Sequence, residues 1–353
     1  MSRFWSELAR GLTPYVPGEQ PVDEPLVKLN TNENPYPPSP AVGRALAALD
    51  VQRLRLYPDP DSARLRRAIA ARNGLQPQQV FVGNGSDEVL AFAFLGLLKH
   101  SGPLCFPDVT YSFYPVWSEL CGIDVREVPV SSDLAIDPAA FPADCGGIIL
   151  PNPNAPTGLL LGLPALRELL ARHRDCVVVV DEAYIDFGGE SAVSLVRDFD
   201  NLLVVQTLSK SRALAGLRVG FALGDAALIE GLERVKNSFN SYTLDLLAEE
   251  VALAAFEDED YFQQTCRAVV DSRESLRASL LQMGFEVLPS AANFLFVHHP
   301  CRPAGELFGA LREKGVLVRY FARPRIDDYL RISIGTPQQC AILVDALREI
   351  LGA

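Results

Sequence analysis

The chain has 353 residues, 48% of them hydrophobic and 22% charged, which is an ordinary globular composition with room for about two domains. Lys and Arg number 32 against 44 Asp and Glu, and the net charge of −12 argues against nucleic acid or an anionic membrane as the main partner. The longest apolar run, Val89 to Leu98, is about half of a membrane span, and residues 1–10 contain no apolar signal stretch, so we expect a cytoplasmic protein.

Cysteine and histidine give no sign of a disulfide framework or a metal site. The seven cysteines form no CxxC pair, and their odd number predicts reduced thiols. The four histidines lie outside any metal-ligand spacing, so we expect no metal. The basic residues are 27 arginines and only five lysines. Lys210, which follows an apolar run and lies among small residues, therefore invites a chemical role, although a solvated loop lysine is the alternative.

The amino-terminal part of the chain is predicted to be irregular at first. Residues 1–30 contain four prolines and are expected to form an arm laid over another surface. The Asn- and Pro-rich segment 30–40 is irregular for the same reason. An amphipathic helix is predicted from Asp61 to Arg72, with Asp61 or Ser62 as its N-cap.

The middle of the chain alternates short apolar runs with helical stretches. A strand that breaks at Gly83 precedes a helix that is apolar nearly all round and should be buried. Further apolar runs occupy residues 103–106, 146–150, 177–180, 202–205 and 219–223. Because parallel strands buried on both faces read as such runs, we predict an α/β fold with a largely parallel sheet between helices. Functional residues are expected at the carboxyl ends of these strands.

The pattern changes at about residue 245. Longer helices and the strand-like sequences FEVL, NFLFV, GVLVRYF and LRISI predict a second, α+β domain. We therefore divide the chain into an arm (residues 1–30), a large domain (31–243) and a smaller carboxyl-terminal domain (244–353).

Polar side chains follow two of the predicted strands. Asp181 and Tyr184 come after one apolar run, Lys210 comes after the next, and Arg218 follows eight residues later. One pocket at the strand ends can collect them. A lysine amine can form a Schiff base with an aldehyde, and a buried aspartate can keep a ring nitrogen protonated, as pyridoxal chemistry requires.

A phosphate group on such a cofactor needs a binding site of its own. The GNGSDE turn places the backbone N–H groups of residues 85–87 at a helix N-terminus. With the hydroxyls of Thr207 and Ser209 and the guanidinium of Arg218, these groups would bind a phosphate dianion. The combination fits a phosphorylated, electrophilic cofactor.

A series of motifs extends over residues 28–336: LNTNENPYPPSP, RLYPDPDS, FVGNGSDE, PDVTYSFYP, PNPNAPTG, VVVDEAYIDF, TLSKSRALAGLRVGF, SAANFLFV and LRISIGTP. In this order they resemble the fold-type I, pyridoxal-phosphate-dependent aminotransferases, and among them the histidinol-phosphate aminotransferases. The resemblance implies a mostly parallel, seven-stranded sheet in the large domain. It also implies pyridoxal 5'-phosphate as the cofactor and a homodimer as the assembly.

The resemblance assigns cofactor roles to residues of this chain. Lys210 corresponds to the Schiff-base lysine and Asp181 to the partner of the pyridinium nitrogen. Tyr184 corresponds to the phenol that hydrogen-bonds the cofactor O3′, and Tyr111 to the aromatic ring stacked on the cofactor. The phosphate-binding positions are Ser86 and Asp87 by backbone amides, with Ser209 and Arg218.

Further positions imply contacts with substrate and with a second subunit. Tyr57 corresponds to a tyrosine that reaches the cofactor phosphate of the neighbouring subunit. Arg331 corresponds to the arginine that binds the anionic end of the substrate, and Asn32 is a second substrate-binding candidate. One position departs from the family's NNPTG motif, because Ala155 replaces the asparagine that helps to hold O3′. Either Asn154 takes over through a shifted backbone, or Tyr184 acts alone.

Purely structural roles are the alternatives for these residues. They are a helix cap for Asp181, core packing for Tyr184 and Tyr111, a turn for Tyr57 and Asn32, and an ion pair for Arg331.

The resemblance implies transfer of the amino group of L-histidinol phosphate to 2-oxoglutarate, which yields imidazole-acetol phosphate and glutamate in histidine biosynthesis. Lys210 would act as general base and acid in the proton shift. Alternatives on the same fold are an aromatic-amino-acid aminotransferase and a threonine-phosphate decarboxylase. A non-catalytic module that binds the cofactor is an alternative of a different class. We expect an amino donor and a 2-oxo acid as small-molecule partners, and neither nucleic acid nor membrane.

Overall fold

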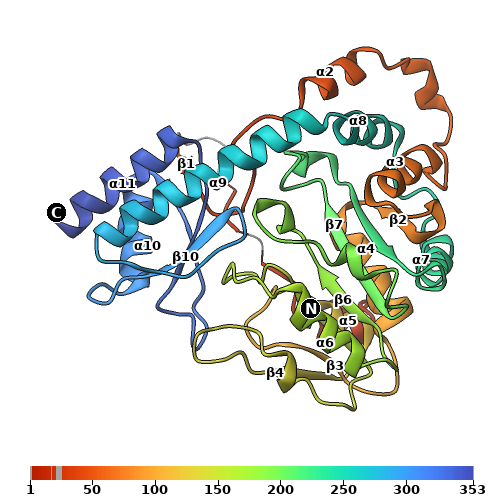
Figure 1. The fold of residues 1–353 in the computed structure, drawn as a ribbon, viewed down its shortest axis with the longest axis horizontal. Helices are drawn as coiled ribbons and strands as arrows, with labels where there is room; N and C mark the ends of the chain where they lie inside the picture. Colours follow the sequence, from red (N-terminus) through yellow and green to blue (C-terminus); the bar gives the residue numbers. More distant parts are fainter. Residues whose placement is uncertain (1, 17, 21–25, 353) are drawn as a thin grey trace.

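The computed structural model describes residues 2–16, 18–20 and 26–352. These residues form two packed units, a larger one around a seven-stranded sheet and a smaller one around a four-stranded sheet (Figure 1). The predicted α/β fold with a second, smaller domain is confirmed.

The large sheet is mostly parallel, as predicted. Its strand order is β2-β8-β7-β6-β5-β3-β4, and only β8 runs antiparallel to its neighbours. The strands are β2 (Val80–Gly83), β3 (Leu104–Pro107), β4 (Val125–Val128), β5 (Gly147–Pro151), β6 (Val178–Asp181), β7 (Leu202–Thr207) and β8 (Gly220–Gly224). The apolar runs predicted all of these except β4, an edge strand with three exposed residues and no continuous apolar run.

Helices cover both faces of this sheet. They are α2 (Pro40–Ala47), α3 (Ala63–Asn73), α4 (Gly85–Ala93), α5 (Tyr114–Cys121), α6 (Leu163–Arg172), α7 (Ala226–Phe239) and α8 (Leu246–Glu257). One hydrophobic cluster joins α3, α6 and α8 to one face, and a second cluster joins α4, α5 and α7 to the other. The resulting three layers bury the sheet.

Helix α3 illustrates how local sequence sets an element. Leu65 and Ile69 form its buried stripe, as the periodicity predicts. The predicted N-cap is only partly right, because Ser62 occupies the cap position but its side chain accepts no capping bond. The carboxylate of Asp59 accepts from the N–H of Ala63 at 2.9 Å instead.

The small unit is built on antiparallel strands. Their order is β12-β13-β10-β9, and a separate parallel pair, β1 with β11, lies beside them. These strands are β1 (Val27–Lys28), β9 (Glu286–Val287), β10 (Phe294–His298), β11 (Val316–Leu317), β12 (Arg319–Tyr320) and β13 (Leu330–Ser333). The helices of this unit are α9 (Glu259–Gln282), α10 (Ala304–Glu313) and α11 (Pro337–Leu351), and α1 (Glu7–Gly11) lies in the amino-terminal segment.

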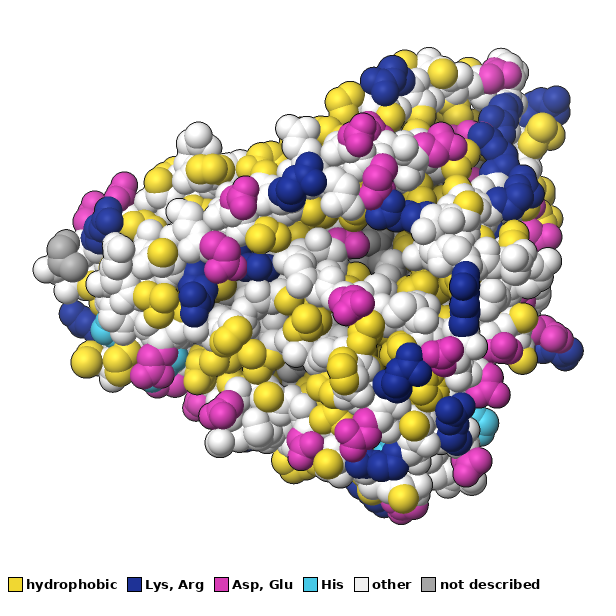
Figure 2. Space-filling model, in the orientation of Figure 1, with side chains coloured by type: hydrophobic (Ala, Val, Ile, Leu, Met, Phe, Trp, Pro, Cys, Tyr) yellow, Lys and Arg dark blue, Asp and Glu magenta, His cyan; other side chains and the backbone are white. Residues whose placement is uncertain are grey.

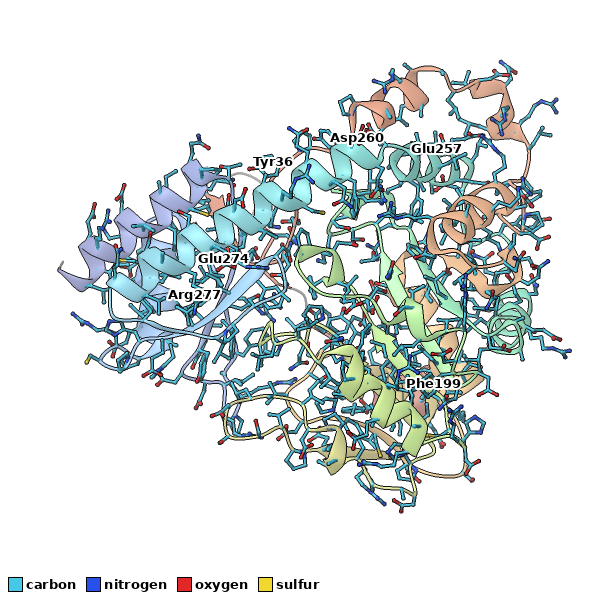
Figure 3. The ribbon with its side chains drawn as sticks, in the orientation of Figure 1. Tyr36, Phe199, Glu257, Asp260, Glu274 and Arg277 are labelled. Carbon is cyan, nitrogen blue, oxygen red and sulfur yellow. The ribbon has the colours of Figure 1, made fainter. Side chains whose placement is uncertain are left out.

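The division between the two units is decided by packing. Ala252 and Phe256 of α8 belong to the core of the large unit, whereas Leu29 belongs to the core of the small unit. The core of the large unit therefore extends through α8 to the α8–α9 junction, between Glu257 and Asp260 in Figure 3, and the division at residue 243 stays a prediction. The segment around β1 accordingly packs with the small unit.

Charged side chains of both signs are interspersed on the face shown in Figure 2, and basic ones gather at its upper right. This corner contains α3 and the short helix of residues 51–55. Arg53 and Arg64 both pair with Glu250 of α8, so part of this positive charge is compensated. Among the described residues, no helix is long and apolar enough to cross a membrane.

Candidate active site

A cavity of about 200 Å³ lies where the large and small units meet at the carboxyl ends of β6 and β7. Predicted residues that line it are Asn32, Ser86, Asp87, Tyr111, Asp181, Tyr184, Thr207, Ser209, Lys210, Arg218 and Arg331. Side chains separated by up to 299 positions thus share one space, at the sheet edge where parallel strands place functional groups.

Asp181 ends strand β6 and is buried against this cavity. Its Oδ2 accepts a hydrogen bond from the Tyr114 hydroxyl at 2.9 Å. Its Oδ1 has no hydrogen-bond partner among the described residues. Burial raises the pKa of Asp181 to about 6, since a carboxylate out of water is destabilised. A cationic donor in the cavity would satisfy the free oxygen and stabilise the ionised form.

Lys210 follows strand β7, and its amine reaches the cavity. The Nζ donates to the carbonyl of Thr31 at 3.2 Å and lies 5.8 Å from the ring centroid of Tyr184. Asn34 holds the lysine's backbone, because its Nδ2 donates to the Lys210 carbonyl at 3.0 Å. The amine therefore lies beside the ring of Tyr184. Lys210 follows strand β7, which pairs with strand β6, the strand that ends in Asp181.

Tyr184 and Asn32 are joined by a hydrogen bond. The Asn32 Nδ2 donates to the Tyr184 hydroxyl at 3.0 Å, and the Ser333 hydroxyl donates to Asn32 Oδ1 at 2.9 Å. The Asn293 amide donates to the Asn32 carbonyl at 2.9 Å. Asn32 adopts φ 56°, a left-handed conformation that asparagine tolerates. Besides making a turn, it therefore orients the phenol.

The start of α4 forms an anion cradle with Arg218. The Arg218 Nη2 lies 2.9 Å from Asp87 Oδ2, and Thr207 donates to the Ser209 hydroxyl at 3.0 Å. A Cβ on Gly85, at φ +79°, would lie 2.5 Å from Arg218 Nη2. Glycine is thus required for the guanidinium to approach the helix N-terminus, where backbone N–H groups and a cation together bind phosphate.

Tyr111 forms part of an aromatic wall of the cavity. Its hydroxyl donates to Asp87 Oδ1 at 3.3 Å. Its ring meets the edge of the Tyr114 ring, with centroids 5.6 Å apart and planes at 88°. Burial, then the charge of Asp87, raises the pKa of Tyr111 well above its usual value. The phenol is therefore neutral, and its ring can pack against a flat ligand.

Two arginines face each other on the small-unit side. Arg319 of β12 and Arg331 of β13 are direct cross-strand neighbours, and both line the cavity. The Arg331 Nη2 donates to the carbonyl of Asn30 at 3.0 Å, while its Nε has no partner among the described residues. Burial lowers the pKa of Arg331. The pair is suited to an anion with two or more acceptor oxygens.

Asn154 and Tyr57 do not line the cavity. The Asn154 Nδ2 donates to the carbonyl of Val109 at 3.0 Å, whereas Ala155 lines the cavity. Tyr57 is 82% exposed and stacks on Tyr242 at 4.6 Å. Within one chain, Asn154 and Tyr57 therefore lie apart from the predicted residues that line the cavity.

Sequence reasoning missed Tyr15, Tyr114 and Arg319. Tyr15 lines the cavity and stacks on Phe113 at 4.6 Å, although it belongs to the arm. Tyr114 begins a helix and follows no strand. Arg319 had a usable signal, because it is the one charged residue in the otherwise apolar sequence GVLVRYF.

Comparison with known proteins agrees with this geometry. The family model described as aminotransferase class I and II matches residues 24–347. Histidinol-phosphate aminotransferase 2 of Dechloromonas aromatica is 61% identical over the full length of both chains. The histidinol-phosphate aminotransferase of Aromatoleum aromaticum is 59% identical over 99% of this chain and 100% of its own. The fold matches histidinol-phosphate aminotransferase of Sinorhizobium meliloti, crystallised with pyridoxal-5'-phosphate, with a TM-score of 0.87, 21% identity, and coverage of 100% and 98% of the two chains.

Proposed function

The chain belongs to the aminotransferase class I and II family, and on that premise we propose that it transfers the amino group of L-histidinol phosphate to 2-oxoglutarate. The products are imidazole-acetol phosphate and glutamate, and the pathway is histidine biosynthesis. The observation that carries the substrate assignment is the 61% identity, over both full lengths, to a histidinol-phosphate aminotransferase. The aromatic-amino-acid and threonine-phosphate alternatives have less support.

The residues of the cavity fit pyridoxal 5'-phosphate as the cofactor. The unpartnered Oδ1 of Asp181 suits the protonated ring nitrogen. The cradle of Ser86, Asp87 and Arg218 suits the phosphate, with Thr207 and Ser209 as further donors. When bound, this cofactor supplies an electron sink that stabilises negative charge on the carbon attached to the substrate nitrogen.

The chain's own residues then bind, orient and move protons. The Lys210 amine would hold the cofactor through its aldehyde group, and its Nζ would remove and return the proton that moves during amino transfer. The Tyr184 hydroxyl, which accepts a hydrogen bond from Asn32, would donate to the cofactor O3′. The Asn154 side chain donates to the carbonyl of Val109 and does not line the cavity. We therefore infer that Tyr184 would bind O3′ without the help of Asn154.

The anionic ends of both substrates have one binding position. Arg331 and the neighbouring Arg319 face the cavity from the small unit. A phosphate monoester and a distal carboxylate both offer several acceptor oxygens to a guanidinium fork. We infer that Arg331 binds the phosphate of histidinol phosphate and, in the second half-reaction, the distal carboxylate of 2-oxoglutarate.

A homodimer would bring Tyr57 to a second cavity. Tyr57 lies in a region of exposed apolar side chains that includes Leu54 at 55%, Leu56 at 56% and Tyr242 at 43%. Such a concentration is typical of a protein interface. We propose that Tyr57 crosses this interface and donates to the cofactor phosphate of the other subunit.

Mixed dimers test the crossing. A Tyr57→Phe chain combined with a Lys210→Ala chain places both defects in one site and leaves the other site intact. We expect about half of the wild-type activity per dimer, corrected for the Lys210→Ala and Tyr57→Phe homodimers. Mixed dimers without a fully active site would show that the tyrosine serves its own subunit.

A screen of amino donors tests the substrate assignment. Purified holoenzyme is mixed with histidinol phosphate, aromatic amino acids or threonine phosphate, and the visible absorption of the cofactor is followed in single turnovers. We expect the largest kcat/KM with histidinol phosphate and 2-oxoglutarate. Preference for an aromatic amino acid, or release of carbon dioxide from threonine phosphate, would overturn the assignment.

A further inference from the structure

Tyr114 lies directly behind the cavity and makes one polar contact with its wall. Its side chain is fully buried, and its hydroxyl donates to Asp181 Oδ2 at 2.9 Å. The other oxygen of Asp181 is the unpartnered Oδ1. A buried phenol needs a hydrogen-bond partner, and this partner is the carboxylate assigned to the cofactor ring.

We propose that Tyr114 is a positioning residue of the transamination reaction, which fixes the carboxylate of Asp181 and thereby keeps the proton on the cofactor's ring nitrogen. The inference rests on the proposed function, because it assumes that Asp181 faces that nitrogen. It concerns a residue that contacts neither the cavity nor the substrate.

The surroundings of Tyr114 make it a rigid donor. Its ring packs against Phe106 and Trp117, with centroids 6.0 and 6.4 Å away. Its edge also meets the ring of Tyr111 at 5.6 Å. One aromatic cluster therefore positions the carboxylate and the ring expected to stack on the cofactor. Closely packed side chains have few alternative rotamers, so the hydroxyl cannot easily turn away.

The hydrogen bond also acts on the charge of Asp181. Burial raises the pKa of this carboxyl, and the Tyr114 hydroxyl opposes that effect by stabilising the ionised form. The charge of Asp87 on α4 raises the pKa further, while the N–H of Ala183 and the charge of Lys210 lower it. Without the hydroxyl, the carboxylate is more basic, and the proton shared with the ring nitrogen moves toward the carboxyl oxygen.

Tyr114→Phe tests the proposal, because it removes the hydroxyl and keeps the ring. We expect kcat for histidinol phosphate to fall about tenfold, as for one lost hydrogen bond to a charged group, while KM stays within about twofold of the wild-type value because Arg331 is untouched. Nitrogen NMR of cofactor labelled at the ring nitrogen should show a shift toward the unprotonated form. A role in packing alone would leave this NMR signal unchanged.

Tyr261→Phe is the matched control. The Tyr261 hydroxyl donates to the carbonyl of Pro37 at 2.8 Å, outside the cavity. Its variant should match the wild-type protein in kcat and in the nitrogen spectrum.

A second replacement keeps the test decisive if Tyr114→Phe does not fold. 3-Fluorotyrosine at position 114 is a stronger donor of similar size, and we expect it to keep the ring nitrogen protonated to a higher pH than tyrosine does. Unchanged protonation and kcat in the 3-fluorotyrosine protein would overturn the proposal, whether or not Tyr114→Phe folds. Failure of the proposed function would appear differently, as a wild-type enzyme that does not transaminate histidinol phosphate. In that case the nitrogen spectra would still decide whether Tyr114 acts on Asp181.

Discussion

The two walls of the cavity differ in how their charges are compensated. On the large-unit wall, Arg218 pairs with Asp87 at 2.9 Å and Asp181 accepts from Tyr114 at 2.9 Å. On the small-unit wall, Arg319 and Arg331 lie opposite each other, and neither makes an ion pair with a described carboxylate. On the large-unit wall, the charged groups are paired with neighbouring side chains. On the small-unit wall, the two guanidinium groups can bind an anion that enters the cavity.

On the proposed function, this difference would separate cofactor binding from substrate binding. A group that stays bound through many turnovers is best held by preorganised donors on a rigid sheet edge. Substrates that alternate in one site need a charge that is free whenever the site is empty. Two adjacent guanidinium groups repel each other, and an anion between them relieves that repulsion. Changes in the first wall should therefore affect kcat, and changes in the second should affect KM.

The largest expected effect is that of Lys210→Ala. Turnover should be lost altogether, because no other lysine among the described residues lines the cavity. Borohydride reduction followed by mass spectrometry should find no cofactor attached to the variant, whereas the wild-type protein should carry it on Lys210. Attachment to a different residue would contradict the assignment.

Asp181→Asn should reduce kcat by about 10² to 10³-fold, since a neutral amide stabilises a cationic ring less than a carboxylate does, by several kcal/mol, in a site that excludes water.

The pH dependence of cofactor binding gives a second test of Asp181. Burial raises the pKa of Asp181 to about 6, so cofactor affinity of the wild-type apoprotein should fall as pH drops through 6 and the carboxylate is protonated. Titration of apoprotein with cofactor should show this fall in the wild type and none in Asp181→Asn. Near-normal turnover of the variant would make Asp181 a structural residue.

Arg331→Ala should raise KM for both substrates by about 10 to 150-fold, equivalent to the 1.5–3 kcal/mol of hydrogen bonds to a charged group. The absorption of the bound cofactor should not change. Arg277→Ala on α9, labelled in Figure 3, is the control, because Arg277 lies outside the cavity. An effect on 2-oxoglutarate alone would mean that another group binds the phosphate.

The smallest expected effect is that of Asn32→Ala. Loss of its hydrogen bond to the Tyr184 hydroxyl should lower kcat about 2 to 10-fold, as for a bond worth 0.5–1.5 kcal/mol. A double-mutant cycle with Tyr184→Phe measures whether the two residues act together. Additive losses would show that Asn32 acts independently of the phenol.

Local sequence was most informative where structure is encoded by continuous runs. Six of the seven strands of the large sheet were predicted because buried parallel strands are apolar throughout. Asp181 and Lys210 were predicted to share one pocket because each comes at or soon after the end of such a run, and both line the cavity. The edge strand β4 and the packing of α8 on the large sheet were not predicted, since exposure and partner choice depend on neighbours distant in sequence.

The sequence by itself therefore determined the fold class and the meeting of Lys210 and Asp181 in one cavity, because strand ends in a parallel sheet converge in every such fold. Only the tertiary structure decided which asparagine side chain acts in the cavity. The Asn154 amide donates to the carbonyl of Val109, whereas the Asn32 amide donates to the Tyr184 hydroxyl. It also decided that Tyr114 reaches Asp181 and that Arg319 lies beside Arg331. Hydrogen bonds and cross-strand neighbours depend on side-chain direction after packing, and no local pattern of residues specifies that direction.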